Sequence, residues 1–403
     1  MSINIRLSIM MFLQYAIWGA WYVTVGNFMS VSGMDSVIHW AYTVSPIAAI
    51  ISPFFLSMVA DRYFATEKVL AVLQILGGIA LLAAPAMAEI SPTIFILTLL
   101  INMICYMPTI GLTNSMAFAH MTDQEKQFPI IRVFGTIGWI AAGIFVSGIL
   151  EADKTDIPFL VAGVLSIFMG LFSFVLPHTP PPAAGQKTTF RQIIGIEAFN
   201  KIKSKPFIVF LVSSFLICIP LAVYYSYAPV FVNASGLENP AFKMSFGQMS
   251  EALFIIMMPL LFPIFGIKRM LLIGMGAWAL RYALFAFGAP DTVSWMILTG
   301  IILHGICYDF FFVAGFIYVD KKAVPEIRAQ AQGFVVLATY GVGMLIGSQI
   351  AGYIYNNIVT DSSNAMLQWK QFWFVPAILS VLVMIFFWIM FKDKEVEKNR
   401  GPL

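Results

Sequence analysis

The fold is decided by stretches such as Phe207–Val232, whose sequence is FIVFLVSSFLICIPLAVYYSYAPVFV and contains no charged residue. A helix needs about 20 apolar residues to cross the hydrocarbon core of a bilayer, and this stretch is longer than that. Inside lipid a helix pairs its backbone N–H and C=O groups within one segment. The stretch therefore predicts a transmembrane helix.

The composition of the whole chain agrees with this prediction. The 403 residues are 60% apolar and only 11% charged, and their mean hydropathy is +0.87. A water-soluble domain carries roughly a quarter of charged residues. This inventory excludes a soluble enzyme, and the net charge of +3 is too small to indicate a nucleic-acid partner.

Apolar runs of similar length recur along the chain and predict an all-α integral membrane protein with twelve transmembrane helices in two six-helix bundles. The bundles are expected at 1–178 and 206–403, with a short cytoplasmic tail at the C-terminus. A cytoplasmic linker at 179–205 separates them and contains an amphipathic helix at 190–199. The predicted spans are 7–30, 38–60, 67–88, 92–118, 128–150, 158–177, 207–232, 246–266, 269–289, 293–319, 329–357 and 367–391.

Basic residues in the loops predict the orientation, because Lys and Arg accumulate on the cytoplasmic side. With both termini in the cytoplasm, only Lys154, Lys243 and Lys370 fall outside, while Arg132 and Arg281 lie within spans. The other Lys and Arg residues all fall inside. The chain is therefore expected to be a multi-pass protein of the cell (inner) membrane.

Four charged residues remain inside the predicted spans: Arg132, Glu251, Arg281 and Asp309. A charge at the bilayer centre costs about 2.5–3.5 kcal/mol on insertion scales, so such groups pair or face a watery cavity. Glu251 and Arg281 lie at similar predicted depth. Arg132 and Asp309 come from different halves, where a pair would act as a gate. All four could also be structural pairs that hold the bundle together.

Further polar and aromatic residues accompany these charges. Arg132 and Thr136 are four residues apart, and Gln248 and Glu251 are three apart, so each pair shares one helical face. This spacing favours a polar cavity, although buried amides such as Gln14, Asn102 and Asn114 often serve only as links between helices. Flat rings beside polar groups suit a ligand such as a sugar or a nucleoside. The rings concerned are Trp18, Trp139, Tyr225 and Tyr308. His304 lies in span ten, close in sequence to Tyr308 and Asp309.

Eight motifs spread over both halves of the chain are distinctive: FLQY (12–15), WGAW (18–21), YMPT (106–109), FPIIRVFGTIG (128–138), QMSEALF (248–254), LRYALF (280–285), YDFF (308–311) and IRAQAQG (327–333). Through these motifs the chain resembles the nucleoside:proton symporter family of the major facilitator superfamily over nearly its whole length.

The resemblance implies substrate contacts for Arg132, Thr136, Trp139, Gln248 and Glu251, with Glu251 and Gln248 bonding the ribose hydroxyls or the base. It also implies a functional aspartate at Asp309.

The chain departs from the family at positions that help to define the ligand. The family's Gln and Asn of span seven fall at Ala222 and Tyr225, a span-ten tyrosine is His304, and the following phenylalanine is Tyr308. We expect Tyr225, His304 and Tyr308 to line the site. These departures leave the preferred base undefined. Another glycosidic or sugar-like solute is the alternative substrate.

The predicted mechanism is proton-coupled import by alternating access. Low-dielectric surroundings favour the neutral form of a carboxylic acid, so Glu251 or Asp309 should carry the coupled proton. Asp309 with Arg132 is the expected gate. The partners are a nucleoside, protons and the lipid bilayer, and the chain is expected to act as a monomer.

Other function classes are a passive facilitator on the same scaffold and a membrane-embedded transferase. The transferase is disfavoured, because the longest polar segment is His178–Lys205 and no domain for a donor substrate is visible. Cys105, Cys218 and Cys307 lie in apolar stretches without paired spacing. The sequence therefore predicts no metal site, no cofactor and no catalytic residue.

Overall fold

The computed structural model describes residues 2–55, 63–121, 124–181, 189–324 and 327–392, and within these ranges every regular element is helical. Ten helices are long and apolar enough to cross a membrane, and Ile157–Ser173 is a shorter apolar helix. One of the ten, Pro240–Gly288, is 49 residues long and has room for two spans. The all-α membrane fold with twelve spans is therefore confirmed. The predicted C-terminal tail lies in 393–403, outside the described residues.

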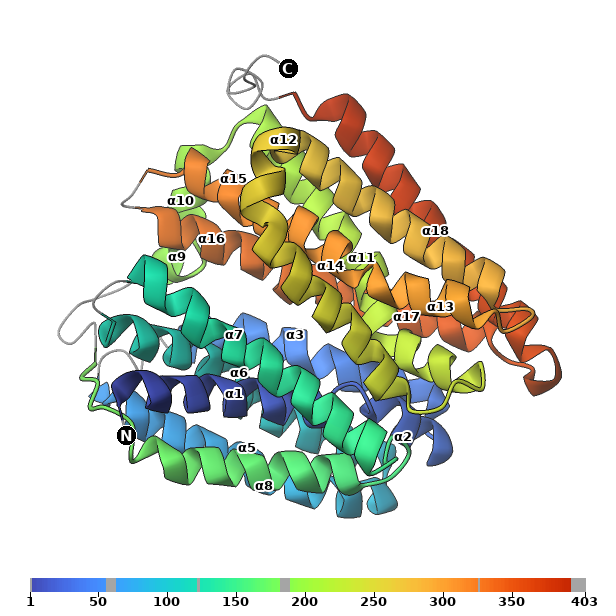
Figure 1. Cartoon of the computed structure of the whole chain (residues 1–403), viewed down its shortest axis with the longest axis horizontal. Coiled ribbons are helices and arrows are strands. Elements are labelled where there is room, and N and C mark those ends of the chain that lie inside the picture. Colours follow the sequence, from blue (N-terminus) through green and yellow to red (C-terminus); the bar gives the residue numbers. More distant parts are fainter. Residues whose placement is uncertain (1, 56–62, 122–123, 182–188, 325–326, 393–403) are drawn as a thin grey trace. The chain divides into compact units, whose positions relative to one another are not determined.

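The chain forms two compact units, and each is described by itself. Unit 1 comprises Met1–Thr189 together with Asn239–Ser245. Its helices, shown in blue to green in Figure 1, are α1 (Ile3–Trp21), α2 (Val25–Val31), α3 (Ile38–Phe55), α5 (Thr66–Ile90), α6 (Pro92–Ala119), α7 (Gln124–Gly143) and α8 (Ile157–Ser173). A π-helical segment, η3 (Ile144–Ile149), continues α7. The bundle limits 178 and 206 predicted from the sequence stay a prediction.

Unit 2 comprises Phe190–Glu238 and Phe246–Leu403. Two π-helical segments interrupt its spans, η4 (Asp309–Val313) after α14 and η6 (Leu337–Gly343) after α16. Its helices are α9 (Phe190–Ile193), α10 (Ile196–Ile202), α11 (Lys205–Ala234), α12 (Pro240–Gly288), α13 (Ser294–Ile302), α14 (His304–Tyr308), α15 (Ala314–Lys322), α16 (Arg328–Val336), α17 (Met344–Ile358) and α18 (Ala365–Met390).

The two predicted spans at 246–266 and 269–289 are joined in α12 without an intervening loop. The junction is Gly266, whose φ of 66° and ψ of 171° are not helical. An L side chain is strained at such a φ, so glycine permits the sharp turn. Figure 1 shows α12 reversing its direction between its two spans.

A buried polar network fixes the helices of unit 1 to one another. The Gln14 amide donates to the Thr109 hydroxyl at 2.7 Å, and the Gln74 amide donates to the Gln14 carbonyl oxygen at 2.9 Å. Ser166 donates to the Gln74 side-chain oxygen at 2.7 Å. These bonds connect α1, α5, α6 and α8, and Asn102 similarly donates to the Gly77 carbonyl at 3.0 Å. Gln14 and Asn102 thus link helices, which is the alternative left open by the sequence.

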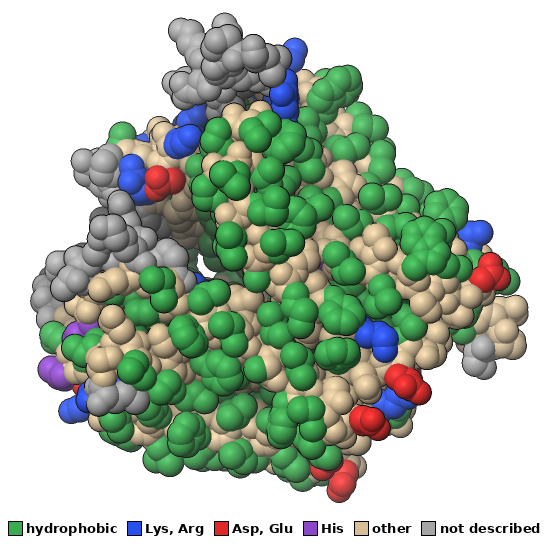
Figure 2. Space-filling view, in the orientation of Figure 1, with side chains coloured by type: hydrophobic (Ala, Val, Ile, Leu, Met, Phe, Trp, Pro, Cys, Tyr) green, Lys and Arg blue, Asp and Glu red, His purple; other side chains and the backbone are tan. Residues whose placement is uncertain are grey.

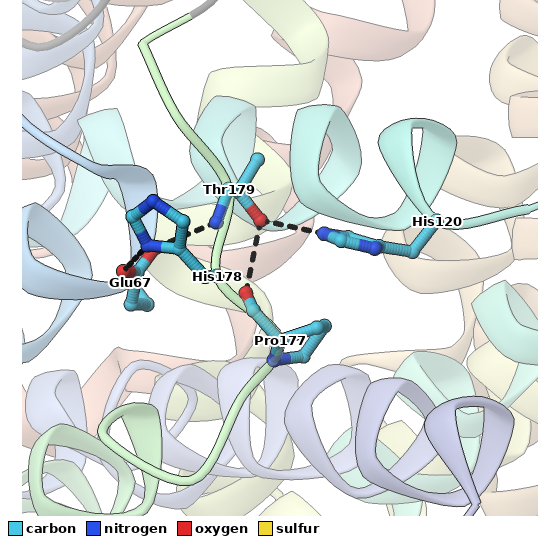
Figure 3. Close-up of polar contacts among 5 residues, drawn as sticks. All are labelled: Glu67, His120, Pro177, His178 and Thr179. Carbon is cyan, nitrogen blue, oxygen red and sulfur yellow. Dashed lines mark hydrogen bonds and ion pairs between the residues drawn. The ribbon is translucent and has the colours of Figure 1, made fainter.

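A second polar cluster fastens the chain that leaves α8 (Figure 3). Glu67, in the first turn of α5, accepts the Thr179 backbone N–H at 3.0 Å and lies 2.8 Å from His178 Nδ1. The Thr179 hydroxyl lies 2.8 Å from His120 Nε2 at the end of α6 and donates to the Pro177 carbonyl at 3.0 Å. The first residues of the linker are thereby held to α5 and α6.

The amphipathic helix predicted at 190–199 is instead two short helices, α9 and α10. Gly195 separates them with a φ of 72°. A Cβ at this glycine would lie 2.6 Å from the Gln330 carbonyl oxygen, so the backbone approaches α16 closely. Phe199 of α10 packs on Phe334 of α16 with ring centroids 4.9 Å apart. Phe199 therefore packs on protein within unit 2, whereas Phe190 is exposed.

The first turn of α12 belongs to unit 1 and is held there by Asp153. The two carboxylate oxygens of Asp153 accept the Ala241 backbone N–H at 2.8 Å and the Ser147 hydroxyl at 2.5 Å. A side chain distant in sequence thus satisfies one of the N–H groups that a helix start leaves unpaired. The Asp153 side chain is buried, and burial raises its pKa.

Hydrophobic side chains cover much of the visible surface of both units, and the charged side chains gather near helix ends (Figure 2). Large apolar residues are strongly exposed along the spans, including Ile256, Leu260 and Trp388. Water-soluble monomers rarely expose contiguous apolar surface on this scale. The surface is that of a protein whose helices are surrounded by lipid chains.

Candidate functional site

In unit 1 the predicted substrate-binding residues share one face of α7. Arg132, Thr136 and Trp139 follow one another at intervals of four and three residues, which aligns their side chains along a helix. All three are half-buried in the structure. The structure therefore brings this predicted set together on one helix.

The Arg132 side chain lies across the neighbouring helix α1. Its guanidinium carbon is 4.1 Å from the centroid of the Tyr15 ring, which is cation–π distance. A Cβ at Gly135 would lie 2.6 Å from Tyr15 Cδ2 and 2.7 Å from Arg132 Nη1. Glycine at this position therefore leaves the room that the Arg132–Tyr15 contact occupies. Tyr15 could not be identified from the sequence except by its place in the FLQY motif.

Trp139 belongs to an aromatic cluster with residues of α1 and α6. Its ring centroid is 5.4 Å from that of Trp18, in an edge-on arrangement, and Trp18 lies 5.7 Å from Tyr106. Gly19 lets the helices approach, because a Cβ there would lie 3.0 Å from the Trp139 Cα. The Trp18 Nε1–H is buried without a hydrogen-bond partner among the described residues. Flat rings and an N–H donor thus adjoin the Arg132–Thr136 face.

In unit 2, Glu251 of α12 and His304 of α14 lie side by side. The distance between Glu251 Oε2 and His304 Nε2 is 3.7 Å. The two helices meet closely here, since the Gly305 N–H donates to Ser250 Oγ at 3.2 Å and a Cβ at Gly305 would lie 2.5 Å from the Ser250 carbonyl carbon. The Glu251 side chain is 25% exposed, whereas that of His304 is 2% exposed. Glu251 is therefore the accessible member of the pair.

Aromatic rings surround His304. Tyr224 stacks on it at 5.5 Å with an angle of 17°, and Tyr308 stacks at 5.7 Å with an angle of 30°. Tyr225 meets it edge-on at 6.2 Å. The predicted residues Tyr225, Glu251, His304 and Tyr308 are thus brought together within unit 2.

Gln248 and Asp309 complete the polar set of unit 2. Gln248 is half-buried one turn before Glu251, and its side-chain oxygen has no hydrogen-bond partner among the described residues. Asp309 is fully buried, and both of its carboxylate oxygens likewise lack such a partner. The pairing of Asp309 with Arg132 stays a prediction, because these residues belong to different units.

Arg281, which the sequence places at a depth similar to that of Glu251, makes its described contacts with other groups. Arg281 is fully buried, its Nε–H donates to the Gly300 carbonyl at 3.0 Å, and its guanidinium carbon lies 4.0 Å from the Tyr224 ring centroid. Its two terminal nitrogens have no hydrogen-bond partner among the described residues. Equal depth in the membrane does not decide which side chains meet, because the rotation of each helix about its axis matters as well.

Tyr340 is a neighbour of this site that the sequence did not indicate. Its hydroxyl donates to the Tyr308 hydroxyl at 2.7 Å. Tyr308 immediately precedes the π-helical segment η4, and Tyr340 lies within the π-helical segment η6. Such segments are rare and frequent at functional sites. Tyr340 did not stand out in the sequence, because the predicted span 329–357 holds several other polar side chains.

Each unit thus presents hydrogen-bonding groups beside flat rings, which is the chemistry that recognises a sugar hydroxyl and a planar base. Among the described residues no group of three His, Cys, Asp or Glu side chains could hold a metal ion.

Comparisons with known proteins agree with this chemistry. The model of the family described as "Nucleoside H+ symporter" matches residues 1–396. YegT of Escherichia coli (strain K12) is 38% identical and covers 98% of this chain and 96% of its own, while the nucleoside permease NupG of the same strain is 31% identical and covers 100% and 99%. A crystal structure of the nucleoside transporter NupG superposes with a TM-score of 0.87 at 30% identity, covering 98% of this chain and 100% of that chain. This chain belongs to the nucleoside H+ symporter family of membrane transporters, and it is not an enzyme.

Proposed function

We propose that this protein imports nucleosides together with protons by alternating access across the cell membrane. The observation that carries the proposal is the Glu251 carboxylate, partly exposed within a span beside His304 and a cluster of tyrosines. A carboxylate in this setting can hold both a sugar hydroxyl and a proton. The full-length match to the symporter family supports the same function.

The substrate contacts are proposed to come from both units. Arg132 and Thr136, with Gln248 and Glu251, supply hydrogen bonds to the ribose hydroxyls and the base. Trp139, Tyr225 and Tyr308 supply flat surfaces, and His304 adjoins Glu251. Apart from His304, each of these residues is only partly buried, so its side chain is open to a solute.

Proton coupling is assigned to Glu251, with Asp309 and Arg132 as the gate. Protonation of a carboxylate removes a charge that is costly to move through a low-dielectric interior. A site that is neutral when it holds proton and nucleoside can reorient more readily than one that holds nucleoside alone. Movement of the nucleoside is thereby coupled to movement of the proton down the pH gradient.

The substrate preference within this class is the open part of the proposal. Ala222 and Tyr225 replace the family's polar pair in span seven, and Ala222 is buried without a side chain that could bond a base. A glycosidic solute other than a nucleoside is therefore the second candidate. A screen of thermal stabilisation with nucleosides, nucleobases and sugars separates the two, because a ligand that binds the folded state raises its melting temperature.

The functional test is uptake into proteoliposomes that contain the purified protein. Radiolabelled uridine and xanthosine should accumulate when the outside is acidic, and a proton ionophore should abolish the accumulation. Counterflow that is independent of the pH gradient, without any accumulation, would instead identify a passive facilitator.

The membrane setting is proposed as follows. The protein is a monomer of the cell (inner) membrane with both termini in the cytoplasm. The asymmetry of Lys and Arg in the loops supports this orientation. Protease or cysteine-label access to a tag at each terminus in intact cells and in inverted vesicles tests it.

A further inference from the structure

A groove of about 440 Å³ opens between the start of α11 and the end of α18, both in unit 2. Its polar end is formed by Lys203, Ser204 and Lys205. Its remaining wall is apolar and consists of Ile208, Val209, Val212, Phe386 and Met390. The groove is distant in sequence from all the substrate residues discussed above.

The apolar wall has the character of a lipid-facing surface. Ile208 and Val212 are four residues apart on one face of α11 and are 45% and 39% exposed. Met390, from the last turn of α18, is 38% exposed. Three apolar side chains thus lie along a shallow channel, which suits a hydrocarbon chain.

The polar end carries positive charge, and no acidic residue is among the described side chains that line it. Lys203 and Lys205 flank Ser204, the N-cap of the 30-residue helix α11, whose hydroxyl accepts the Phe207 N–H at 3.4 Å. The N-terminal end of a helix adds about half a positive charge to that of the lysines. The hydrogen bond described for Lys203 goes to the Asn200 side-chain oxygen at 3.4 Å. The ion pairs among the described residues leave Lys203 and Lys205 without a carboxylate partner.

The charges stand where a span meets the membrane surface. Lys203 and Lys205 lie at the first turn of α11, and Met390 lies at the last turn of the neighbouring α18. The apolar wall runs from this end along the spans. The groove therefore offers cations at headgroup depth and hydrocarbon contacts beneath them.

We propose that this groove binds an anionic phospholipid, with its phosphate between Lys203 and Lys205 and one acyl chain along Ile208, Val212 and Met390. Basic pockets between transmembrane helices recognise anionic headgroups in this way. The occupant is a lipid rather than a soluble anion, because a soluble anion has no hydrocarbon chain that could contact the apolar wall.

Such a lipid would stabilise the junction at which the linker enters the transmembrane bundle. The segment before the groove, α10, is anchored on α16 through Phe199 and Phe334, and α11 follows directly after Lys203 and Ser204. A phosphate at this point would fix α10 and α11 in one relative orientation. Because α11 also carries Tyr225, anionic lipid should raise transport activity as well as stability.

The test measures lipid binding to the full-length protein by native mass spectrometry and by thermal unfolding in detergent, with phosphatidylglycerol as the probe. Phosphatidylcholine and inorganic phosphate serve as comparison ligands. Wild type should bind phosphatidylglycerol preferentially, and the double variant K203Q/K205Q should bind it about 30-fold more weakly, since each lysine contributes about fivefold.

Two further variants make the result specific. Lys201→Gln removes an exposed lysine of α10 that does not line the groove, so its binding should equal that of wild type. Val212→Trp fills the apolar channel without changing charge and should weaken lipid binding while leaving any binding of inorganic phosphate intact.

Two outcomes would overturn the proposal: phosphatidylcholine bound as tightly as phosphatidylglycerol, or equal losses in Lys201→Gln and in the double variant. Inorganic phosphate that stabilises the protein as much as the lipid would show a simple anion site instead. None of these readouts requires transport, so they are independent of the proposed function.

Discussion

At the scale of single residues, Glu251 differs from the other membrane-embedded carboxylate, Asp309, because its side chain is partly exposed while that of Asp309 is fully buried. An accessible carboxylate can exchange both a proton and a solute contact, whereas a buried one can do neither without a rearrangement. This difference makes Glu251 the residue at which substitution should separate proton coupling from solute exchange.

We predict that Glu251→Gln abolishes uphill, pH-gradient-driven uptake in proteoliposomes and retains a slower nucleoside counterflow. Glutamine keeps the size and the hydrogen-bonding oxygen but cannot take up the proton. Glu89→Gln, the same change at an exposed position near the end of α5, should leave both activities unchanged. Full gradient-driven uptake by Glu251→Gln would exclude Glu251 as the proton carrier.

Gly135 gives a second prediction, because it sets the place of Arg132. The Cβ of Gly135→Ala would lie 2.6 Å from Tyr15 and 2.7 Å from Arg132, so these side chains must move. Forcing a group into a filled site costs roughly 1–3 kcal/mol, and we expect a rise in KM of about tenfold or more.

Gly333→Ala is the matched control for this change. Gly333 lies in α16 with no neighbouring atom within 4 Å of an added Cβ. Alanine there should leave KM unchanged and stabilise the helix by roughly 0.5–1 kcal/mol. Equal KM values for both alanine variants would contradict the positioning of Arg132 through Gly135.

At the scale of helices, the sequence predicted more about each helix than about its neighbours. The spans follow from the need to cross lipid, and the common face of Arg132, Thr136 and Trp139 follows from helical periodicity. Partners on different helices could not be predicted, because they depend on how each helix is rotated and packed. The proximity of Glu251 to His304 is one such case. Gly195 likewise interrupted a segment whose amphipathic pattern predicted one helix.

The start of α12 gives the prediction at this scale. Asp153→Ala would remove the acceptor of the Ala241 N–H and of the Ser147 hydroxyl, and we expect a loss of about 1 kcal/mol or more in thermal unfolding. Asp153→Asn keeps an acceptor for Ala241 and a donor for Ser147 without a buried charge. Asp156→Asn, in the same loop but exposed and without a capping bond, is the control.

The pH dependence distinguishes these variants further. Burial raises the pKa of Asp153 above its ordinary value of 3.8, so between the two pKa values the folded protein binds more protons than the unfolded chain. This residue's contribution to stability therefore falls as the pH rises through that window. Asp153→Asn should lack this fall, and a melting curve with the same pH dependence as wild type would contradict the assignment.

At the scale of the whole molecule, alternating access requires contacts that form in one state and break in another. A carboxylate with two buried oxygens and no hydrogen-bond partner among the described residues, such as that of Asp309, is costly to keep in a single state. A partner gained during the transport cycle would offset this cost. Arg132 is the proposed partner, and the pair would connect the two halves of the chain.

We therefore predict that Asp309→Asn slows both net uptake and counterflow by about tenfold or more, equivalent to about 1.4 kcal/mol in the barrier between states. Nucleoside binding, measured as thermal stabilisation, should change far less, because the proposed ligand contacts stay in place. Asp320→Asn is the matched control, since Asp320 pairs with Arg328 at 3.0 Å and both are about half exposed. Exposed pairs contribute little, so this variant should transport normally. Transport by Asp309→Asn at the wild-type rate would remove Asp309 from the gate, whereas a parallel loss of nucleoside binding would place it among the substrate ligands.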